Sequence, residues 1–171
     1  MTYSDPAPLE RHHNLDPFVC RSEEQTRWLK KFARQSASSD LTKVFVVTDS
    51  ARTDDVVAYY AWCMANLDIA ALPEAMTKGT GRYPQPVVLL ARLGVDVGHE
   101  GRGLGYGMLQ DVLQRTAVLS SGIGCRGLLV HAESTEARDY YVHLIPQFAP
   151  SPTDPMHLVL RIKDIRRSLG L

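Results

Sequence analysis

The feature that most constrains this fold is an apolar run, Val87–Val95, followed after a short interval by closely spaced glycines and an amphipathic stretch. Gly101, Gly103 and Gly105 leave no side chain between the backbone amides and a neighbouring ligand. A helix that begins directly after such a turn directs its positive end at the same place. The segment therefore predicts a strand, a glycine turn and a helix that together hold an anionic ligand such as a pyrophosphate.

Two familiar nucleotide-binding motifs do not match this spacing. The dinucleotide fingerprint needs a third glycine where this chain has Tyr106 or Met108. The P-loop needs a lysine, and none lies between Lys78 and Lys163. What remains is a strand, a glycine, one residue, a second glycine and a helix. A glycine turn that serves only the backbone is also common, and it stays open as an alternative for this motif alone.

Hydrophobic period and turn residues predict the other elements. A capping box at Ser22–Gln25 begins a helix that extends to about Gln35. A hairpin of strands 43–48 and 56–64, joined by residues 49–55, is expected to follow this helix. Next come a short helix at 72–78, a loop at 79–86, the strand 87–95 and a helix at 103–119. The chain then forms a strand at 127–131, a helix at 134–143 and a strand at 157–162, which precedes a charged tail. This order predicts an α/β fold, with a mixed sheet and helices on both faces.

Composition excludes several classes of protein. The 171 residues contain no repeat or linker, which favours a single domain over residues 1–171, with 1–14 as a loosely ordered N-terminal arm. Without a long apolar run or a secretion signal, we expect a cytoplasmic protein with no membrane partner. The three cysteines and six histidines show no metal-ligand spacing, so no metal is expected. The formal net charge is zero, so nucleic-acid binding would need a local basic patch.

Six blocks of the sequence, in this order, resemble the GNAT acetyltransferase toxins of type II toxin–antitoxin modules. They are Leu72–Ala75, Pro84–Asp96, Gly101–Gly105, Leu128–Ala132, Glu136–Tyr141 and Pro150–Met156. The resemblance extends over nearly the whole chain. It implies the GNAT acyl-CoA N-acyltransferase fold and an enzyme that moves an acetyl group from acetyl-CoA to the α-amino group of an aminoacyl-tRNA, which blocks translation. It also implies a ribbon-helix-helix antitoxin and a homodimer.

The same resemblance assigns residues to the acetyl-CoA site. The pyrophosphate would be bound by Arg102, Gly103, Leu104, Gly105, Tyr106 and Gly107. Backbone amides around Val95 and Val97 would polarise the thioester carbonyl, by analogy with GNAT folds, although both valines could equally belong to the core. Glu100 departs from the family's loop, which has glutamine or arginine there, and we expect Arg102 to neutralise it.

A tyrosine is the expected general acid. Acetyl transfer from a thioester needs a group that protonates the departing thiolate, and a phenol with a pKa of about 10 keeps its proton at neutral pH. Tyr141 occupies the position of the general-acid tyrosine in the family's motif, whereas Tyr140 points about 100° away on a helix and is interpreted as a packing residue. The alternative for Tyr141 is an ordinary aromatic side chain.

Basic residues suggest where tRNA binds. Arg27, Lys30, Lys31 and Arg34 recur at helical spacing along one face of the first helix, and Arg82 and Arg92 are further candidates. The alternatives are a solvated helix face for the first four and a buried salt bridge for Arg92.

Two other functions also fit the sequence. One is a GNAT N-acetyltransferase for a small amine or a protein amine. The other is a catalytically weak regulator that binds acetyl-CoA, since Glu100 departs from the family's loop.

Overall fold

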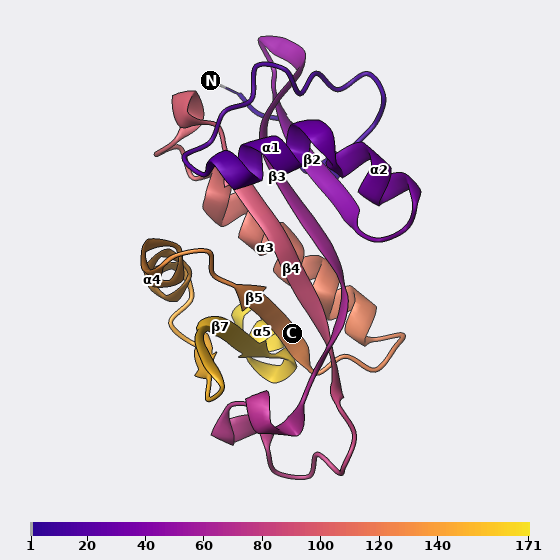
Figure 1. Ribbon diagram of the computed structural model, residues 1–171, viewed down its shortest axis with the longest axis vertical. Helices are drawn as coiled ribbons and strands as arrows, with labels where there is room; N and C mark the ends of the chain where they lie inside the picture. Colours follow the sequence, from indigo (N-terminus) through magenta and orange to yellow (C-terminus); the bar gives the residue numbers. More distant parts are fainter. Residues whose placement is uncertain (1) are drawn as a thin grey trace. The chain divides into compact units, whose positions relative to one another are not determined.

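The computed structural model describes residues 2–171 and divides them into two compact units, of which the first contains the glycine turn. The first unit comprises Met1–Cys63 and Ala91–Asp111, and the second comprises Met64–Leu90 and Val112–Leu171. The strands and helices are β1 (Ala7–Pro8), α1 (Glu23–Lys31), α2 (Ala33–Ser38), β2 (Lys43–Asp49), β3 (Arg52–Leu67), β4 (Gln85–Val95), α3 (Leu104–Ser120), β5 (Gly127–His131), α4 (Thr135–Leu144), β6 (Ala149–Ser151), β7 (Asp154–Arg161) and α5 (Ile162–Ser168), shown in Figure 1. The prediction of one undivided domain stays a prediction.

The first unit is built on antiparallel pairing of β1, β2 and β3, with β4 next in the sheet. Tyr59 and Tyr60, adjacent in β3, lie on opposite faces of this part of the sheet, because successive side chains of a strand point to opposite sides. The hydroxyl of Tyr59 donates to the Gln25 carbonyl of α1, at 2.8 Å, and that of Tyr60 donates to Asp111 of α3, at 2.7 Å. Helices therefore lie on both faces of this part of the sheet, as predicted, and Figure 1 shows α1 and α2 across β2 and β3.

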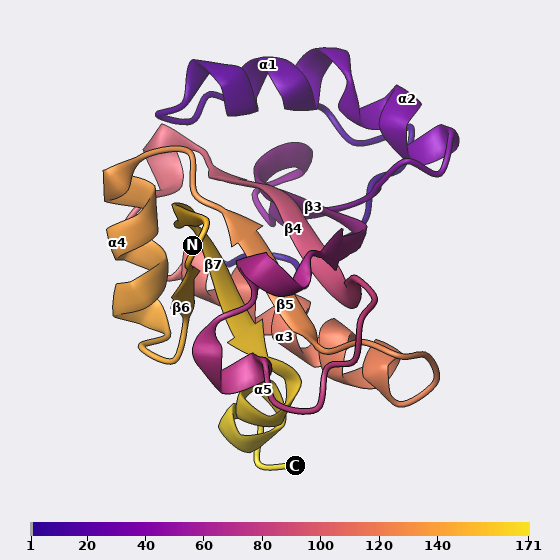
Figure 2. The ribbon, with the colours of Figure 1, turned by 60° about the horizontal axis from the view of Figure 1, so that its bottom comes forward.

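The second unit contains the mixed part of the sheet. Strand β5 pairs in parallel with β4, through Val88 and Leu128, and antiparallel with β7. The strand order in this part of the sheet is β3-β4-β5-β7-β6. Strands β3 and β4 are counted here as well because each has residues in both units. Gly127 is required at the start of β5, since a Cβ at this position would collide with the Leu160 carbonyl of β7. Figure 2 shows α4 beside the β6–β7 hairpin.

Several predicted boundaries were wrong in ways that have physical causes. The first helix is broken at Phe32, whose φ of −122° is not helical, so that α2 begins at Ala33. The turn between β2 and β3 is much shorter than predicted because the strands continue through the polar residues. The short helix near Leu72 is a pair of 3-10 turns, Ile69–Ala71 and Glu74–Met76.

The two ends of the chain also differ from expectation. Residues 2–14 are not a loose arm: Ser4 and Leu9 donate backbone hydrogen bonds to Thr48 and Val44 of β2, at 3.0 and 2.9 Å. The charged tail after Arg161 is the helix α5, with Ile165 fully buried. The last strand begins earlier than predicted, at Asp154, because it pairs with the short edge strand β6.

No helix among residues 2–171 is both long enough and apolar enough to cross a membrane.

Candidate acetyl-CoA site

The glycine turn follows β4 through a short capped segment. Asp96 ends the strand region and accepts hydrogen bonds from the Gly98 amide, at 2.8 Å, and from the Val19 amide, at 2.9 Å. The chain then turns through Gly101 and Gly103, whose φ angles are +72° and +79°. Only glycine adopts such angles readily, which explains why the sequence alternates glycine with other residues here.

The turn is open on the side where its glycines lack side chains. A Cβ added at Gly101, Gly103 or Gly107 would meet no atom within 4 Å. Helix α3 begins at Leu104, and the amides of a helix's first turn have no partner within the helix. Together with the helix dipole, these amides favour an anion at this position. The predicted pyrophosphate loop therefore has both the backbone shape and the free space that a phosphate group needs.

Helix α3 is held in place by its buried face. Gly105 is buried, and Met108, Leu109, Val112 and Leu113 are each fully buried. Tyr106, by contrast, is 48% exposed, so that it lies on the open side of the first turn. Apolar packing thus orients the helix while its first turn remains accessible.

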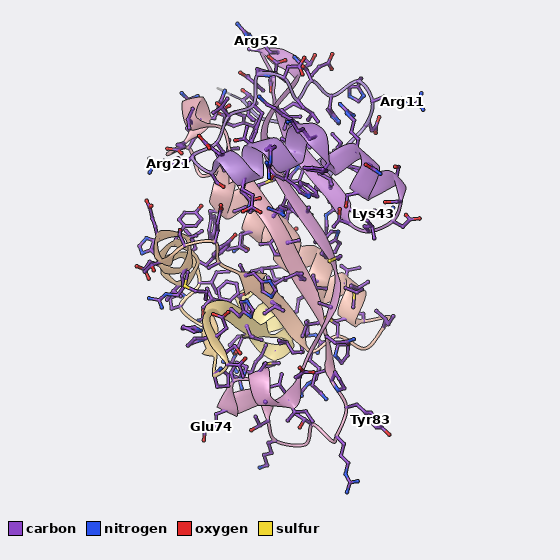
Figure 3. The ribbon with its side chains drawn as sticks, in the orientation of Figure 1. Arg11, Arg21, Lys43, Arg52, Glu74 and Tyr83 are labelled. Atoms are coloured by element: carbon purple, nitrogen blue, oxygen red, sulfur yellow. The ribbon has the colours of Figure 1, made fainter. Side chains whose placement is uncertain are left out.

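The charge of Glu100 is balanced by a residue that the sequence did not indicate. Arg21 forms a two-pronged ion pair with this carboxylate, with Nε–Oε1 and Nη2–Oε2 distances of 2.9 Å (Figure 3 labels Arg21). Arg102, which was expected in this role, donates instead to the Tyr3 hydroxyl at 3.1 Å. The Glu100 carboxylate is therefore paired with a residue of the segment before α1.

The expectation for the two valines is only partly compatible with the structure. Val95 is the last residue of β4. The amide of Val97 already donates to the Val19 carbonyl at 2.8 Å, so it is not available to polarise a thioester carbonyl in this conformation. Its side chain is 50% exposed and so is not part of the core.

Tyr141 lies in the second unit, on α4, in an aromatic environment. Ser134 caps this helix by accepting from the Ala137 amide at 3.1 Å. Tyr141 is 8% exposed and packs edge-to-face against Phe148, with ring centroids 6.1 Å apart. Burial raises the pKa of its phenol, and the charges of Tyr140 and Glu133 act in the same direction.

The Tyr141 hydroxyl is nevertheless accessible. It forms no hydrogen bond with any of the residues 2–171, and among these residues no fully buried side-chain polar atom lacks a partner. The hydroxyl therefore keeps a small exposed area, although the ring is buried. A protonated phenol with an available O–H is what a general acid requires. Tyr140, interpreted as a packing residue, is in fact 41% exposed.

The proposed basic face of the first helix is smaller than the sequence suggested. Arg27, Lys30 and Lys31 are exposed on α1 and form no ion pair within residues 2–171. Arg34 lies beyond the break, in α2, and its guanidinium donates to the carbonyls of Glu10 and His13 at 2.9 and 2.6 Å. Arg34 thus holds the N-terminal segment and is separated from the other three.

The remaining basic candidates differ from each other. The side chain of Arg92 pairs with Glu24 at 2.8 Å and lies over the Trp28 ring at 5.4 Å. This is a salt bridge but not the buried one considered above, because the Glu24 side chain is 56% exposed. Arg82 is exposed in the loop before β4, next to Tyr83, which points outward in Figure 3. Arg92 therefore has a structural role, and Arg82 remains available.

Two residues near the glycine turn, Tyr3 and Arg21, were missed by the sequence analysis. Each is distant in sequence from the turn and belongs to no motif, so no signal in a single sequence could have identified it.

Comparison with known proteins places the chain in a family. No family model matches it. The tRNA-acetylating toxin of Mycobacterium tuberculosis is 35% identical over 168 residues, which cover 98% of each chain. The probable toxin TacT of Sinorhizobium fredii is 28% identical over 170 residues, covering 95% of this chain and 93% of the relative.

Solved structures agree on the fold. AtaT complexed with acetyl-methionyl-tRNAfMet has a TM-score of 0.89 at 22% identity and covers 98% of this chain and 99% of its own. A mutant AtaT bound to the C-terminus of the antitoxin AtaR and acetyl-CoA has a TM-score of 0.82 at 19% identity over 100% of both chains. These likenesses establish the GNAT fold that the sequence predicted. With the identity to the mycobacterial protein over almost the full length, the chain belongs to the family of tRNA-acetylating toxins.

Proposed function

We propose that this chain is an acetyltransferase toxin that transfers the acetyl group of acetyl-CoA to the α-amino group of an aminoacyl-tRNA and so blocks translation. The observation that carries the proposal is the open glycine turn at the start of α3, in a chain that is 35% identical to a tRNA-acetylating toxin. Acetyl-CoA supplies the activated acetyl group as a thioester.

The residues of the turn would hold the donor through its pyrophosphate. Gly101 and Gly103 leave space for the phosphates, and the first-turn amides of α3 donate to them. Arg102, at the turn, adds a positive charge on an exposed residue. The ion pair of Arg21 with Glu100 offsets the negative charge of Glu100, which would oppose binding.

Tyr141 would supply the proton that the reaction needs. The amine forms a C–N bond to the acetyl carbon, the C–S bond breaks, the amine loses a proton and the sulfur gains one. The raised pKa of Tyr141 keeps its phenol protonated, and its accessible hydroxyl can donate to the sulfur. An α-amine with a pKa of about 7.7–8.0 is partly neutral at pH 7, so the acceptor needs no strong base.

The tRNA would contact exposed cations. Arg27, Lys30 and Lys31 on α1 form no ion pair within residues 2–171, which leaves their charges available for phosphates. Arg82 is a further exposed candidate. We also propose a ribbon-helix-helix antitoxin as partner, a homodimeric state and a location in the cytoplasm, where charged tRNA is used.

The test is incubation of the purified chain with radiolabelled acetyl-CoA and total aminoacyl-tRNA, followed by release and identification of the labelled amino acid. We expect an N-acetylated amino acid with charged tRNA and none with deacylated tRNA. A lysine-containing peptide and a set of free amines are included as acceptors. Label on these alone would favour the small-amine or protein acetyltransferase. Tight acetyl-CoA binding without any transfer would favour the regulator.

A further inference from the structure

Tyr3 connects two residues of the glycine-turn region. Its hydroxyl lies 2.9 Å from Nδ1 of His99 and accepts a hydrogen bond from Nη1 of Arg102 at 3.1 Å. Its ring also packs edge-to-face on His99, with centroids 5.6 Å apart and planes at 74°. The Tyr3 side chain thus holds His99 and Arg102, the residues that flank Glu100 and Gly101.

The backbone around Tyr3 is fixed on both sides. The Ser50 amide donates to the Thr2 carbonyl, and the Ser4 amide donates to the Thr48 carbonyl, both at 3.0 Å. Tyr3 itself forms a bridge with Asp49 at the end of β2. Because this segment is paired with the β2–β3 hairpin, Tyr3 offers its hydroxyl from a defined position.

The chemistry of the three groups sets the direction of the hydrogen bonds. A guanidinium can only donate, so the Tyr3 oxygen accepts from Arg102. The Tyr3 hydroxyl then donates to Nδ1 of His99, in the tautomer that carries its proton on Nε2. The chain of donors runs from Arg102 through Tyr3 to His99 and fixes the position of the Nη1 end of the guanidinium.

We propose that Tyr3 is a positioning residue for acetyl-CoA binding, which orders the Arg102 guanidinium and the His99 side of the glycine turn before the pyrophosphate arrives. The inference rests on the proposed function, because it assumes that the turn binds this group. An arginine that is already ordered loses less conformational freedom on binding than a free one. Tyr3 therefore acts through Arg102 and does not itself need to touch the ligand.

The experiment is a double-mutant cycle of Tyr3→Phe and Arg102→Ala, with coenzyme A affinity measured by isothermal titration calorimetry. Phenylalanine keeps the ring packing and removes only the hydroxyl. We expect Tyr3→Phe to weaken binding roughly twofold to tenfold, which is the cost of immobilising one long side chain on binding. In the Arg102→Ala background the same change should have almost no further effect, because the two residues act together. The matched control is Tyr83→Phe, at a tyrosine that is 81% exposed.

A second readout separates positioning from a general loss of stability. Tyr3→Phe should raise KM for acetyl-CoA and leave kcat and Tm unchanged, and it should not alter kcat/KM for S-acetyl-pantetheine, which lacks the pyrophosphate. Unchanged or tighter coenzyme A binding by Tyr3→Phe, or additive effects in the cycle, would overturn the inference. If the unmodified chain failed to bind coenzyme A, the proposed function itself would fail, which is a different result.

Discussion

The glycine turn and the surroundings of Tyr141 meet opposite physical requirements. The turn is exposed, and its proposed role depends on the absence of side chains at Gly101 and Gly103. Tyr141 is buried among aromatic rings, and its proposed role depends on the groups that surround it. An anion site needs open backbone donors, whereas a general acid needs a protonated group that can reach the leaving atom. A substitution should therefore affect binding in the first region and chemistry in the second.

The largest effect is expected from Gly103→Val. Valine at a φ of +79° is strained, and its branched side chain would fill the space left for phosphate. We expect coenzyme A affinity to fall by more than about 100-fold, measured by titration calorimetry. The matched control is Gly79→Val in the loop before β4, where φ is +76° and the space is equally open. Equal losses in both variants would mean that strain alone is responsible.

Tyr141→Phe should separate chemistry from binding. We expect kcat to fall by roughly 10²–10⁴-fold with coenzyme A affinity unchanged, because only the proton donor is lost. Tyr140→Phe is the control and should retain most of the activity. Since burial raises the pKa of Tyr141, its phenol stays protonated as pH rises, and kcat should show no alkaline decline from this group up to pH 10. A rate unaffected by Tyr141→Phe would remove it from the mechanism.

A third variant tests the RNA side of the first unit. Reversing the charges of Lys30 and Lys31 to glutamate should weaken tRNA acetylation roughly tenfold at low salt and flatten its dependence on salt. Affinity for coenzyme A should not change. The control is Lys43→Glu, at an exposed lysine paired with Asp40 and labelled in Figure 3. An unchanged salt slope would indicate that another surface binds the tRNA.

The smallest effect concerns the charge balance of the turn. Arg21→Ala should weaken coenzyme A binding roughly threefold to tenfold, because it leaves Glu100 uncompensated near the phosphates. The ion pair is largely exposed, so Tm should hardly change. Adding Glu100→Gln to Arg21→Ala should restore the affinity. Failure of this rescue would show that the charge of Glu100 does not influence the site.

Local patterns predicted much of the structure. The strand before the glycine turn, the start of α3, the strand Gly127–His131 and the cap at Ser134 all lie within one or two residues of expectation. These features depend on neighbouring residues, through side-chain period, capping and glycine's backbone freedom. The choice of Tyr141 over Tyr140 came from the family's motif, and it is still to be tested by experiment.

The errors share one physical origin. Strand β6, the helix α5 and the pairing of residues 2–14 with the β2–β3 hairpin depend on distant partners, which a local pattern does not reveal. The break at Phe32 lies within a continuous helical period, so the sequence showed no sign of it.

By itself, the sequence determined that an apolar strand enters a glycine turn and then a helix, because backbone conformation there depends on the glycines themselves. Only the tertiary structure decided that Arg21 balances Glu100, that Val97 gives its amide to Val19 and that Tyr3 holds Arg102. Hydrogen bonds and ion pairs of this kind join residues that are far apart in sequence, and packing selects among many equally charged or polar candidates.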